Sequence, residues 1–408
     1  MKVATSVANI TPKNEVYLCG YVGEERKHPA KGVHDDPLAV SLLIEIKDIK
    51  LLFISIDVIM ISASKADFIK DRICEILPLK KENIIINAIH SHSLANGFTD
   101  EILFGTPDNP EYFQYACSQI IASVQDLNQK LETVRIEIGT TKVHGYYSKR
   151  SDKTLPFEDN ALLIKFLKED QVIASICNFN THATVLGPKN MMLSSDIIGA
   201  VRSHMAQELG VVPYTITGAS GDISNRQYRQ GNDFQELERV AKGIYDNLKD
   251  IDNYSEVKID SVKMSEYDYH IAYDNTAYYE EYQKGIDEAN EVLMKKNISP
   301  DEWKLRTSEK TILENKMNIK EVDFHVKGKV LTLSDLTIVT FPGELASKFG
   351  LYLRSLSPTK YFMIIGYADD YEGYFIEAEE YGKTYETKAS NTPKGESEKM
   401  VHKIGELL

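Results

Sequence analysis

The chain has 408 residues, of which 42% are hydrophobic and 26% charged, a composition that is ordinary for a soluble globular protein. The net charge of −14 argues against a nucleic-acid partner, because binding a polyanion needs a basic surface. The N-terminal residues lack the apolar core of a secretory signal, no segment approaches the roughly 18 apolar residues of a membrane span, and the four cysteines form no C-x-x-C pair, so we expect a cytoplasmic protein with free thiols.

The first recognisable unit spans about residues 38–95. Two β-branched apolar runs, Leu38–Ile46 and Leu51–Ile56, flank a short polar turn and predict a hairpin. A helix and the buried strand IIINAI follow, and this strand ends at His90 and His92. Imidazole is costly to bury without a partner and is a common metal ligand. The pair therefore indicates a metal or proton-transfer site, with two hydrogen-bonded histidines as the alternative.

The second unit spans about residues 159–226. The runs ALLIKFL and VIASICNFN predict another hairpin, whose second strand ends at His182. Asp196 is expected to be the N-cap of a helix, and the strand after it leads into the loop GASGDIS. This loop is either a nest of N–H groups for an oxyanion or a glycine turn. It is not a G-x-S-x-G elbow, so metal-bound water is a better candidate for the attacking group than Ser224.

The third unit spans about residues 329–376. Its hairpin returns as the strand LTIVTF, which ends in a Pro-Gly pair followed by Glu344. The next strand, YFMII, ends in the loop GYADDYEGY, which contains Tyr371 and Tyr374. The three units together predict an α/β fold of mixed sheets with crossover helices, in which residues 1–408 form a single domain.

Three segments between the units have helical character. Residues 111–131 and 234–251 read as amphipathic helices because their apolar residues recur at helical spacing. Residues 276–296 are acidic and rich in tyrosine. We interpret this last segment either as a solvated helical excursion or as a lid over the site.

Polar residues that can bind a metal occupy equivalent strand ends of the units. In α/β folds, sites gather beyond the carboxyl ends of strands. Loops are polar in general, but that does not favour histidine, glutamate and tyrosine over lysine, serine and asparagine. His90, His182 and Glu344 would supply the two imidazoles and one carboxylate known from hydrolytic zinc sites, and Tyr374 could add a fourth oxygen. The sequence thus indicates Zn²⁺ as the cofactor.

Seven short motifs follow one another between about residues 5 and 390. They are GVHDDPL, SIDVI, AIHSHS, THATVLG with SSD behind it, SGDIS, FPGE, and YEGY with EEY and YE behind it. This ordered set resembles the neutral/alkaline non-lysosomal ceramidase family. It is most similar to the short bacterial proteins that share the family's N-terminal catalytic domain and lack its C-terminal β-sandwich domain.

The resemblance implies a zinc-dependent amidase and assigns a role to each motif. It implies that the zinc ligands are His90, His182, Glu344 and Tyr374, that His92 faces the substrate, that Arg150 and Tyr385 contact the substrate or its oxyanion, and that Ser224 matches the serine of the family's Gly-Asp-x-Ser. One motif departs from the pattern. The family's loop continues Ser-Pro-Asn, whereas this chain has Ser224-Asn225-Arg226.

From these observations we predict a zinc-dependent hydrolase that cleaves an N-acyl amide bond by attack of metal-bound water. His92 or a neighbouring acid group would pass a proton to the leaving amine. The substrate is expected to be a small N-acylated molecule, and ceramide is one candidate among others. A metal-dependent esterase or phosphoesterase and a non-catalytic metal-binding module are the alternatives. The acyl and amine groups and the oligomeric state are not specified by the sequence.

Overall fold

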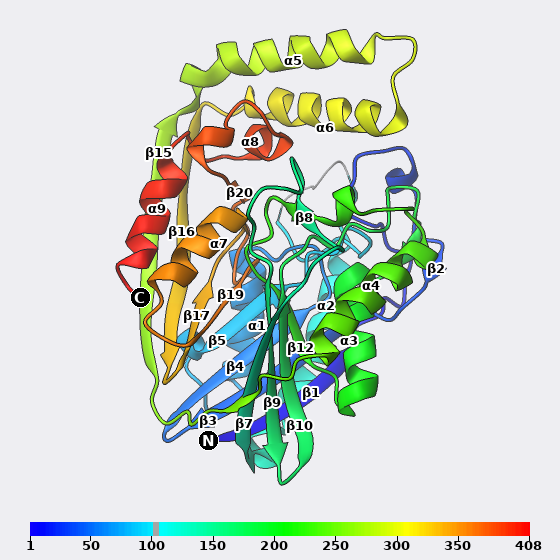
Figure 1. Ribbon diagram of the computed structural model, residues 1–408. Coiled ribbons are helices and arrows are strands. Elements are labelled where there is room, and N and C mark those ends of the chain that lie inside the picture. The colour runs from blue at the N-terminus through cyan, green and yellow to red at the C-terminus, as the bar shows by residue number, and fades with distance from the viewer. Residues whose placement is uncertain (101–105) are drawn as a thin grey trace.

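The computed structural model describes residues 1–100 and 106–408, and within them three larger mixed sheets follow one pattern (Figure 1). In each sheet an antiparallel hairpin is followed by a helix that crosses over to a strand parallel to the second hairpin strand. This α/β architecture, with three degenerate strand-strand-helix-strand units, confirms the predicted fold class.

The units have closely similar lengths and order. The first consists of β3 (Leu38–Ile46), β4 (Ile49–Ile56), α1 (Ala63–Cys74) and β5 (Ile84–Ala88). The second consists of β9 (Asn160–Lys168), β10 (Gln171–Phe179), α3 (Asp196–Leu209) and β12 (Tyr214–Thr217). The third consists of β16 (Glu321–Leu333), β17 (Leu336–Thr340), α7 (Ser347–Leu356) and β19 (Tyr361–Ile365).

The hairpin turns show the repeat at the level of single residues. Lys47, Glu169 and Ser334 begin the three turns, and their φ angles are 53°, 55° and 52°. Each of them is followed by an aspartate. The left-handed conformation lets the chain reverse within two residues and keeps the twist of the flanking strands. The same backbone solution therefore closes the hairpin in every unit.

Each sheet also contains a strand that the pattern of the sequence did not reveal. These strands are β1 (Lys2–Asn9), β7 (Arg135–Lys142) and β15 (Lys263–Asp274), each antiparallel to the first hairpin strand of its unit. The sheet orders are β5-β4-β3-β1-β6, β12-β10-β9-β7-β14 and β19-β17-β16-β15, where β6 (Glu132–Thr133) and β14 (Ser255–Glu256) are short edge strands. The actual unit is thus four strands and one helix.

The two faces of each sheet have different partners. On one face, apolar residues from all three sheets form a shared cluster, to which Phe53, Ile164 and Ile338 belong. On the other face, residues such as Ile54 and Leu163 pack on helices. Because successive side chains of a strand point to opposite faces, a strand buried on both sides is apolar throughout. On the basis of the shared cluster we propose that the units form one domain.

The remaining helices lie around this three-sheet body. They are α2 (Pro110–Val124), α4 (Phe234–Lys249), α5 (Tyr279–Leu293), α6 (Pro300–Lys316), α8 (Tyr385–Ala389) and α9 (Glu396–Gly405). Short 3-10 turns lie at Glu25–Lys27, Lys81–Asn83, Leu127–Lys130, Asn225–Gln227, Asn275–Tyr278 and Ala378–Glu380. Among the residues described, no helix combines the length and the apolar character that crossing a membrane requires.

Helices α5 and α6 form a hairpin at the end of the molecule opposite the N-terminus, where it connects β15 to β16 (Figure 1). The acidic, tyrosine-rich segment predicted at 276–296 corresponds to α5, and α6 was not foreseen. The short helix α8 lies next to α6 (Figure 1). Lys388 of α8 forms an ion pair with Glu309 of α6, with Nζ 3.0 Å from Oε2. This contact joins the helical hairpin to the loops at the strand ends.

Three pairs of two-residue strands tie those loops together. They are β2 (Gly32–Val33) with β11 (Met192–Leu193), β8 (Ser148–Lys149) with β13 (Ile223–Ser224), and β18 (Glu344–Leu345) with β20 (Tyr374–Phe375). An isolated bridge between Ser91 and Ala183 adds a link between the first and second units. The carboxyl ends of strands from different units therefore meet in one place.

Candidate metal centre

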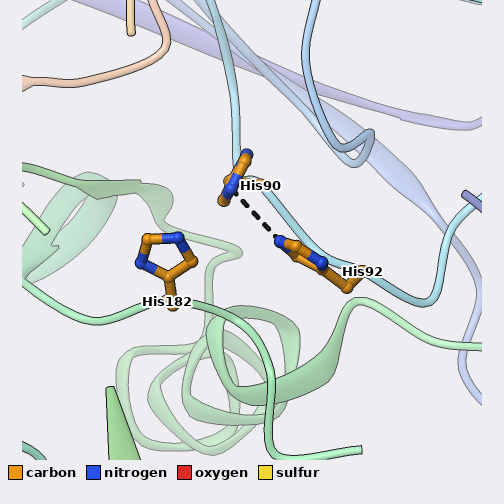
Figure 2. Close-up of side chains that lie close together, drawn as sticks. All are labelled: His90, His92 and His182. Carbon is orange, nitrogen blue, oxygen red and sulfur yellow. Dashed lines mark hydrogen bonds between the residues drawn. The ribbon is translucent and has the colours of Figure 1, made fainter. Parts of the chain in front are cut away.

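Three histidines occupy the meeting point of the strand-end loops. His90 and His92 follow β5, and His182 follows β10. The nitrogen atoms by which they could bind an ion all lie within 4.8 Å of one another (Figure 2). His90 and His182 are almost completely buried. His90 has a φ of 61°, a left-handed conformation that costs a residue with a side chain about 1–2 kcal/mol. Such a cost is typical of positions where the surrounding structure fixes a functional geometry.

The tautomer of each imidazole is fixed by a main-chain carbonyl. Nδ1 of His90 donates to Ile59 O at 2.7 Å, Nδ1 of His92 to Gly20 O at 2.6 Å, and Nδ1 of His182 to Ser220 O at 2.7 Å. A carbonyl oxygen only accepts, so the proton of a neutral ring must be on Nδ1 and the lone pair on Nε2. Burial lowers the pKa of His90 to about 3 and those of the other two histidines well below their usual value. All three rings are thus neutral near pH 7.

The lone pairs of these rings point at one another and at a carboxylate. His90 Nε2 lies 3.2 Å from His92 Nε2. Glu344, which follows β17, places Oε1 3.5 Å from His90 Nε2 and Oε2 2.7 Å from His182 Nε2. Within the described part of the chain, His182 Nε2 and Glu344 Oε2 are buried without a hydrogen-bond partner. Acceptors held this close repel unless a cation lies among them, so the residues present fit a divalent metal.

Electrostatics at Glu344 agree with this interpretation. Burial raises the pKa of the Glu344 carboxyl group, while the His90 imidazole and the Tyr371 hydroxyl act in the opposite direction. A carboxylate in such a place is costly to keep charged without a partner. A bound cation would remove this cost, because it favours the ionised form.

Two tyrosines flank the carboxylate. The Tyr371 hydroxyl donates to Glu344 Oε1. Tyr374 lies opposite Glu344 in the β18–β20 pair, and its ring is stacked parallel to that of His182 with centroids 6.4 Å apart. Burial raises the pKa of both hydroxyls well above 10. The structure therefore brings both tyrosines to the centre, and the role of Tyr374 as a ligand stays a prediction.

Arg150 and Tyr385 lie beside the tyrosines. Arg150 Nη1 donates to Glu386 Oε1 at 2.7 Å, and both side chains are buried. Burial alone would raise the pKa of Glu386, but the Arg150 guanidinium holds it below the usual range. Tyr385 contacts the Tyr374 ring edge to face, with centroids 6.3 Å apart. Helix α8, which carries Tyr385 and Glu386, thus fixes the position of the arginine.

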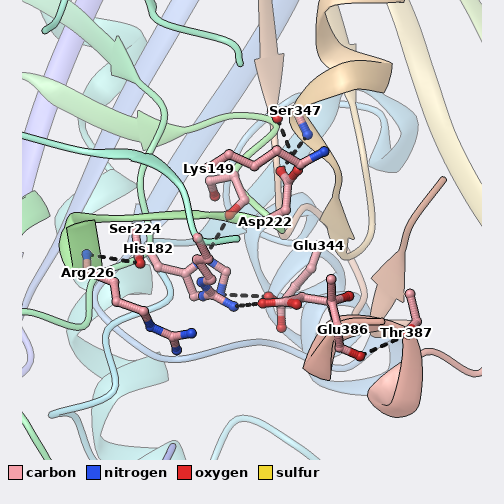
Figure 3. A network of polar contacts seen from close by, with 12 residues as sticks. Lys149, His182, Asp222, Ser224, Arg226, Glu344, Ser347, Glu386 and Thr387 are labelled. Atoms are coloured by element: carbon pink, nitrogen blue, oxygen red, sulfur yellow. Dashed lines mark hydrogen bonds and ion pairs between the residues drawn. The ribbon is translucent and has the colours of Figure 1, made fainter. Parts of the chain in front are cut away.

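The loop after β12 lies against the centre, since Ser220 O accepts from His182 Nδ1. Two of its N–H groups are used within the protein, since Gly221 N donates to Leu345 O at 2.9 Å and Ile223 N to Ser220 O at 3.0 Å. Asp222 accepts hydrogen bonds from Ser347 and lies 3.3 Å from Lys149 Nζ (Figure 3). The glycine-turn interpretation is therefore the appropriate one.

Two polar residues at strand ends do not join the ligand group. Asp57 follows β4 and forms a buried ion pair with Arg202, with Nη1 2.7 Å from Oδ1. Ser224 accepts a hydrogen bond from Arg226 N at 3.3 Å, and in the described residues no base lies within hydrogen-bonding distance of its hydroxyl. Asp57 is thus engaged in the core, and no described group is placed to activate Ser224 as a nucleophile.

A cavity of about 870 Å³ opens above the histidines. Its walls include the predicted site residues His90, His92, Arg150, Ser224, Glu344, Tyr374 and Tyr385, whereas His182 is buried beneath it. Helix α6 supplies a further wall through Ser299, Glu302, Leu305, Ser308 and Ile312. Sequence reasoning missed this wall, because α6 has no strong amphipathic pattern that would show which face is covered.

A second group of possible metal ligands lies on the β15–β16 ladder. His270 and His325 face each other across the two strands with their rings stacked, and Asp323 Oδ1 lies 2.9 Å from His270 Nε2. These side chains are exposed, so water can satisfy them. None of their polar atoms is buried without a hydrogen-bond partner, whereas His182 Nε2 and Glu344 Oε2 are. We therefore do not assign these three residues to a metal site.

The comparisons with known proteins decide the family. The model of the family described as neutral/alkaline non-lysosomal ceramidase, N-terminal, matches residues 2–218. The chain belongs to this family. The resemblance read from the sequence motifs is thereby confirmed, and membership of the ceramidase family implies hydrolase activity. A search of curated protein sequences gave no match.

Solved structures of ceramidases share the fold of this family member. One, described as a ceramidase complexed with C2, is 15% identical, with a TM-score of 0.74 over 98% of this chain and 73% of that chain. Another, the neutral ceramidase from Pseudomonas aeruginosa, is 17% identical, with a TM-score of 0.73 over 100% of this chain and 75% of that chain. At sequence identities this low, the structural similarity shows that this chain and the two ceramidases share a fold.

Proposed function

We propose that this chain is a zinc-dependent hydrolase that cleaves the N-acyl amide bond of a small-molecule substrate. The observation that carries the proposal is the convergence of unprotonated acceptors from His90, His182 and Glu344 at the floor of a cavity. Two imidazoles and one carboxylate form a ligand set of hydrolytic zinc sites. Family membership supports an amide bond as the target.

His90, His182 and Glu344 would hold the ion, with Tyr374 as the proposed fourth ligand. When bound, zinc supplies a water molecule of lowered pKa and polarises the carbonyl group of the substrate. The protein contributes rigidity, since the Nδ1 hydrogen bonds to Ile59 and Ser220 fix the directions of both imidazoles. Such fixed orientation of the ligands is a condition for metal affinity and for catalysis.

His92 is the proposed proton carrier. It lines the cavity, is neutral, and directs Nε2 toward the ligand group while Nδ1 is bound to Gly20 O. A neutral imidazole in this position can take a proton at Nε2 and deliver it to the leaving amine, a contribution of typically ~10²–10⁴-fold in rate. The carbonyl of Gly20 keeps the ring in the tautomer that this task requires.

Arg150 and Tyr385 are the proposed donors to the acyl oxygen as negative charge develops on it. Arg150 is held in place by Glu386, and Tyr385 by its contact with Tyr374. Ser224 lines the same cavity and is proposed to contact the substrate without forming a covalent bond to it. This assignment follows from the missing base near its hydroxyl.

The test combines metal analysis with activity. The purified protein is expected to contain about one equivalent of zinc and to hydrolyse N-lauroyl-ethanolamine, and His182→Ala is expected to lose both properties. His402→Ala on α9 is the matched control, because its imidazole is largely exposed. A native protein without metal, or full activity in His182→Ala, would contradict the proposal. An O-lauroyl ester and a lauryl phosphoester distinguish the alternative bonds.

A further inference from the structure

Two arginines that line the cavity have no ion-pair partner among the described residues. Arg226 and Arg229 follow Ser224 in the chain, and both side chains line the cavity. Over the part of the chain that the structure describes, neither guanidinium makes a hydrogen bond or an ion pair. The hydrogen bond drawn at Arg226 in Figure 3 comes from its main-chain N–H to Ser224 Oγ. Both guanidinium groups therefore line the cavity without a hydrogen-bonded or ion-paired partner among the described residues.

Several other charged groups that line the cavity have partners. Arg150 is paired with Glu386, whose carboxylate also attracts Arg226 without a direct ion pair. On the acidic side of the lining, Asp100 accepts from two serine hydroxyls, and Asp370 accepts from the N–H groups of Ala63 and Tyr371. Asp100 and Asp370, near α1, thus accept hydrogen bonds from their neighbours, whereas the guanidinium groups of Arg226 and Arg229 donate none to the described residues.

The main chain at Arg226 is held in place, whereas its side chain is exposed. The loop is held by the Ser224 hydroxyl and by Gln227, whose Nε2 donates to Arg150 O at 2.8 Å. Partial burial, followed by the neighbouring Arg150, lowers the pKa of Arg226. Arg150 and Arg229 are both close enough to act on Arg226, and a cation near other cations has an unfavourable electrostatic energy that a bound anion relieves. A guanidinium also matches the geometry of carboxylate and phosphate groups.

We propose that Arg226 and Arg229 bind an oxyanion group, such as a carboxylate or a phosphate, on the N-acylated substrate. This inference rests on the proposed function and narrows its substrate class to acidic N-acyl amines or amides of diacids. Arg226 occupies the place where the motif of the resembling family has an asparagine. The lining of the same cavity also includes Val22, Met60, Leu305 and Ile312, whose apolar side chains can accommodate an alkyl chain.

The test uses matched pairs of substrates that differ in one charge. N-lauroyl-glycine is compared with N-lauroyl-ethanolamine, which places the anion on the amine side. The dodecylamide of succinic acid is compared with that of 4-hydroxybutanoic acid, which places the anion on the acyl side. With the zinc-loaded protein, kcat/KM is expected to be at least about 10-fold higher for the acidic member of the pair that fits, because a charge-assisted hydrogen bond is stronger than a neutral one.

Variants test whether the two arginines cause the preference for acidic substrates. Arg226→Gln and Arg229→Gln should each reduce the acidic-to-neutral ratio of kcat/KM by about 10-fold or more, whereas Arg72→Gln on the exposed side of α1 should leave the ratio unchanged. Neutral substrates hydrolysed as well as acidic ones, with no change of the ratio in the variants, would overturn this inference and leave the proposed hydrolase intact. If no amide is hydrolysed, the proposed function fails. In that case, calorimetry measures the affinity for N-lauroyl-glycine of the wild type and of the variant with both arginines replaced by glutamine. Weaker binding to the double variant supports anion binding by the arginines, and equal affinity overturns it.

Discussion

Glu344 Oε2 lies 2.7 Å from His182 Nε2, although the proton of this imidazole is used at Nδ1 by the carbonyl of Ser220. A carboxylate and a lone pair at this distance repel each other. A cation converts the same arrangement into a stabilising one. The stability of the protein should therefore depend on its metal.

We predict that removing the metal with a chelator lowers the Tm and that zinc restores it. A ligand that binds the folded state at about 1,000 times its Kd adds about 4 kcal/mol to the free energy of unfolding. Glu344→Gln should bind no zinc, yet its metal-free form should melt above the metal-free wild type, because the amide N–H₂ can donate to His182 Nε2. Calorimetric scans with and without chelator check both points. A chelator effect of equal size in the two proteins would refute the prediction.

The two tyrosines at Glu344 are predicted to differ in their effect on zinc affinity. Tyr371→Phe removes a hydroxyl that donates to Glu344 Oε1, and the loss of such a supporting hydrogen bond typically weakens metal binding by about 10–100-fold. Tyr374→Phe removes a proposed ligand and should weaken binding further. Competition with a chromophoric chelator measures both constants. A larger loss in Tyr371→Phe would transfer the ligand role to Tyr371.

Gly221→Ala should lower the zinc affinity by displacing the residues that position Glu344. A Cβ atom at this position would lie 2.5 Å from the main-chain carbonyl oxygen of Glu344, so either the loop or the main chain that carries the carboxylate must move. We expect a loss of about 1–3 kcal/mol in the free energy of unfolding together with lower zinc affinity. Gly231→Ala is the control, because its nearest neighbour would be 3.5 Å away. Unchanged zinc affinity in Gly221→Ala would show that the loop does not position Glu344.

Lys316 is predicted to give the protein a distinctive pH dependence. It is buried at the end of α6, donates to Ser390 O, and burial lowers its pKa from 10.5 to about 8. The unfolded chain binds more protons than the folded one between these values, so the stability contributed at this position rises with pH from about 8 to 10.5. Relative to Lys316→Met, the wild type should gain up to about 3 kcal/mol over this range. Urea unfolding at several pH values measures the difference.

The control for this effect is Lys296→Met, which changes an exposed lysine. Its stability should follow that of the wild type at every pH. A pH-independent difference between the wild type and Lys316→Met would mean that Lys316 keeps an ordinary pKa in the folded protein.

Local patterns in the sequence were sufficient to predict the hairpin, helix and following strand of each unit. These elements depend mainly on residues that are close together in the chain. The apolar runs before His90, His182 and Glu344 indicated that these residues lie at strand ends. The strand β15 was missed even though Tyr267, Tyr269 and Ile271 alternate with polar residues. Its alternation is an ordinary strand signal, and its length of 12 residues became clear only through its pairing with β16.

Contacts between distant segments were harder to predict. Asp57 sits at a strand end like His182, but its pairing with Arg202 removes it from the site, and only the packing of α3 on the sheet reveals this. Likewise, nothing local to Pro300–Lys316 shows that α6 lines the cavity, and nothing local to Arg226 shows that its guanidinium pairs with no other described residue. Partners of this kind are set by tertiary packing, and a single sequence does not encode them in a readable pattern.

The proposed ligands come from three successive units, with Glu344 in the last. During synthesis on the ribosome, the first two units emerge with their histidines well before the carboxylate exists. Zinc is therefore expected to enter late, after the third unit has docked. A nascent or truncated polypeptide that ends before this glutamate would contain the two neutral imidazoles without the carboxylate. It should therefore bind zinc only weakly.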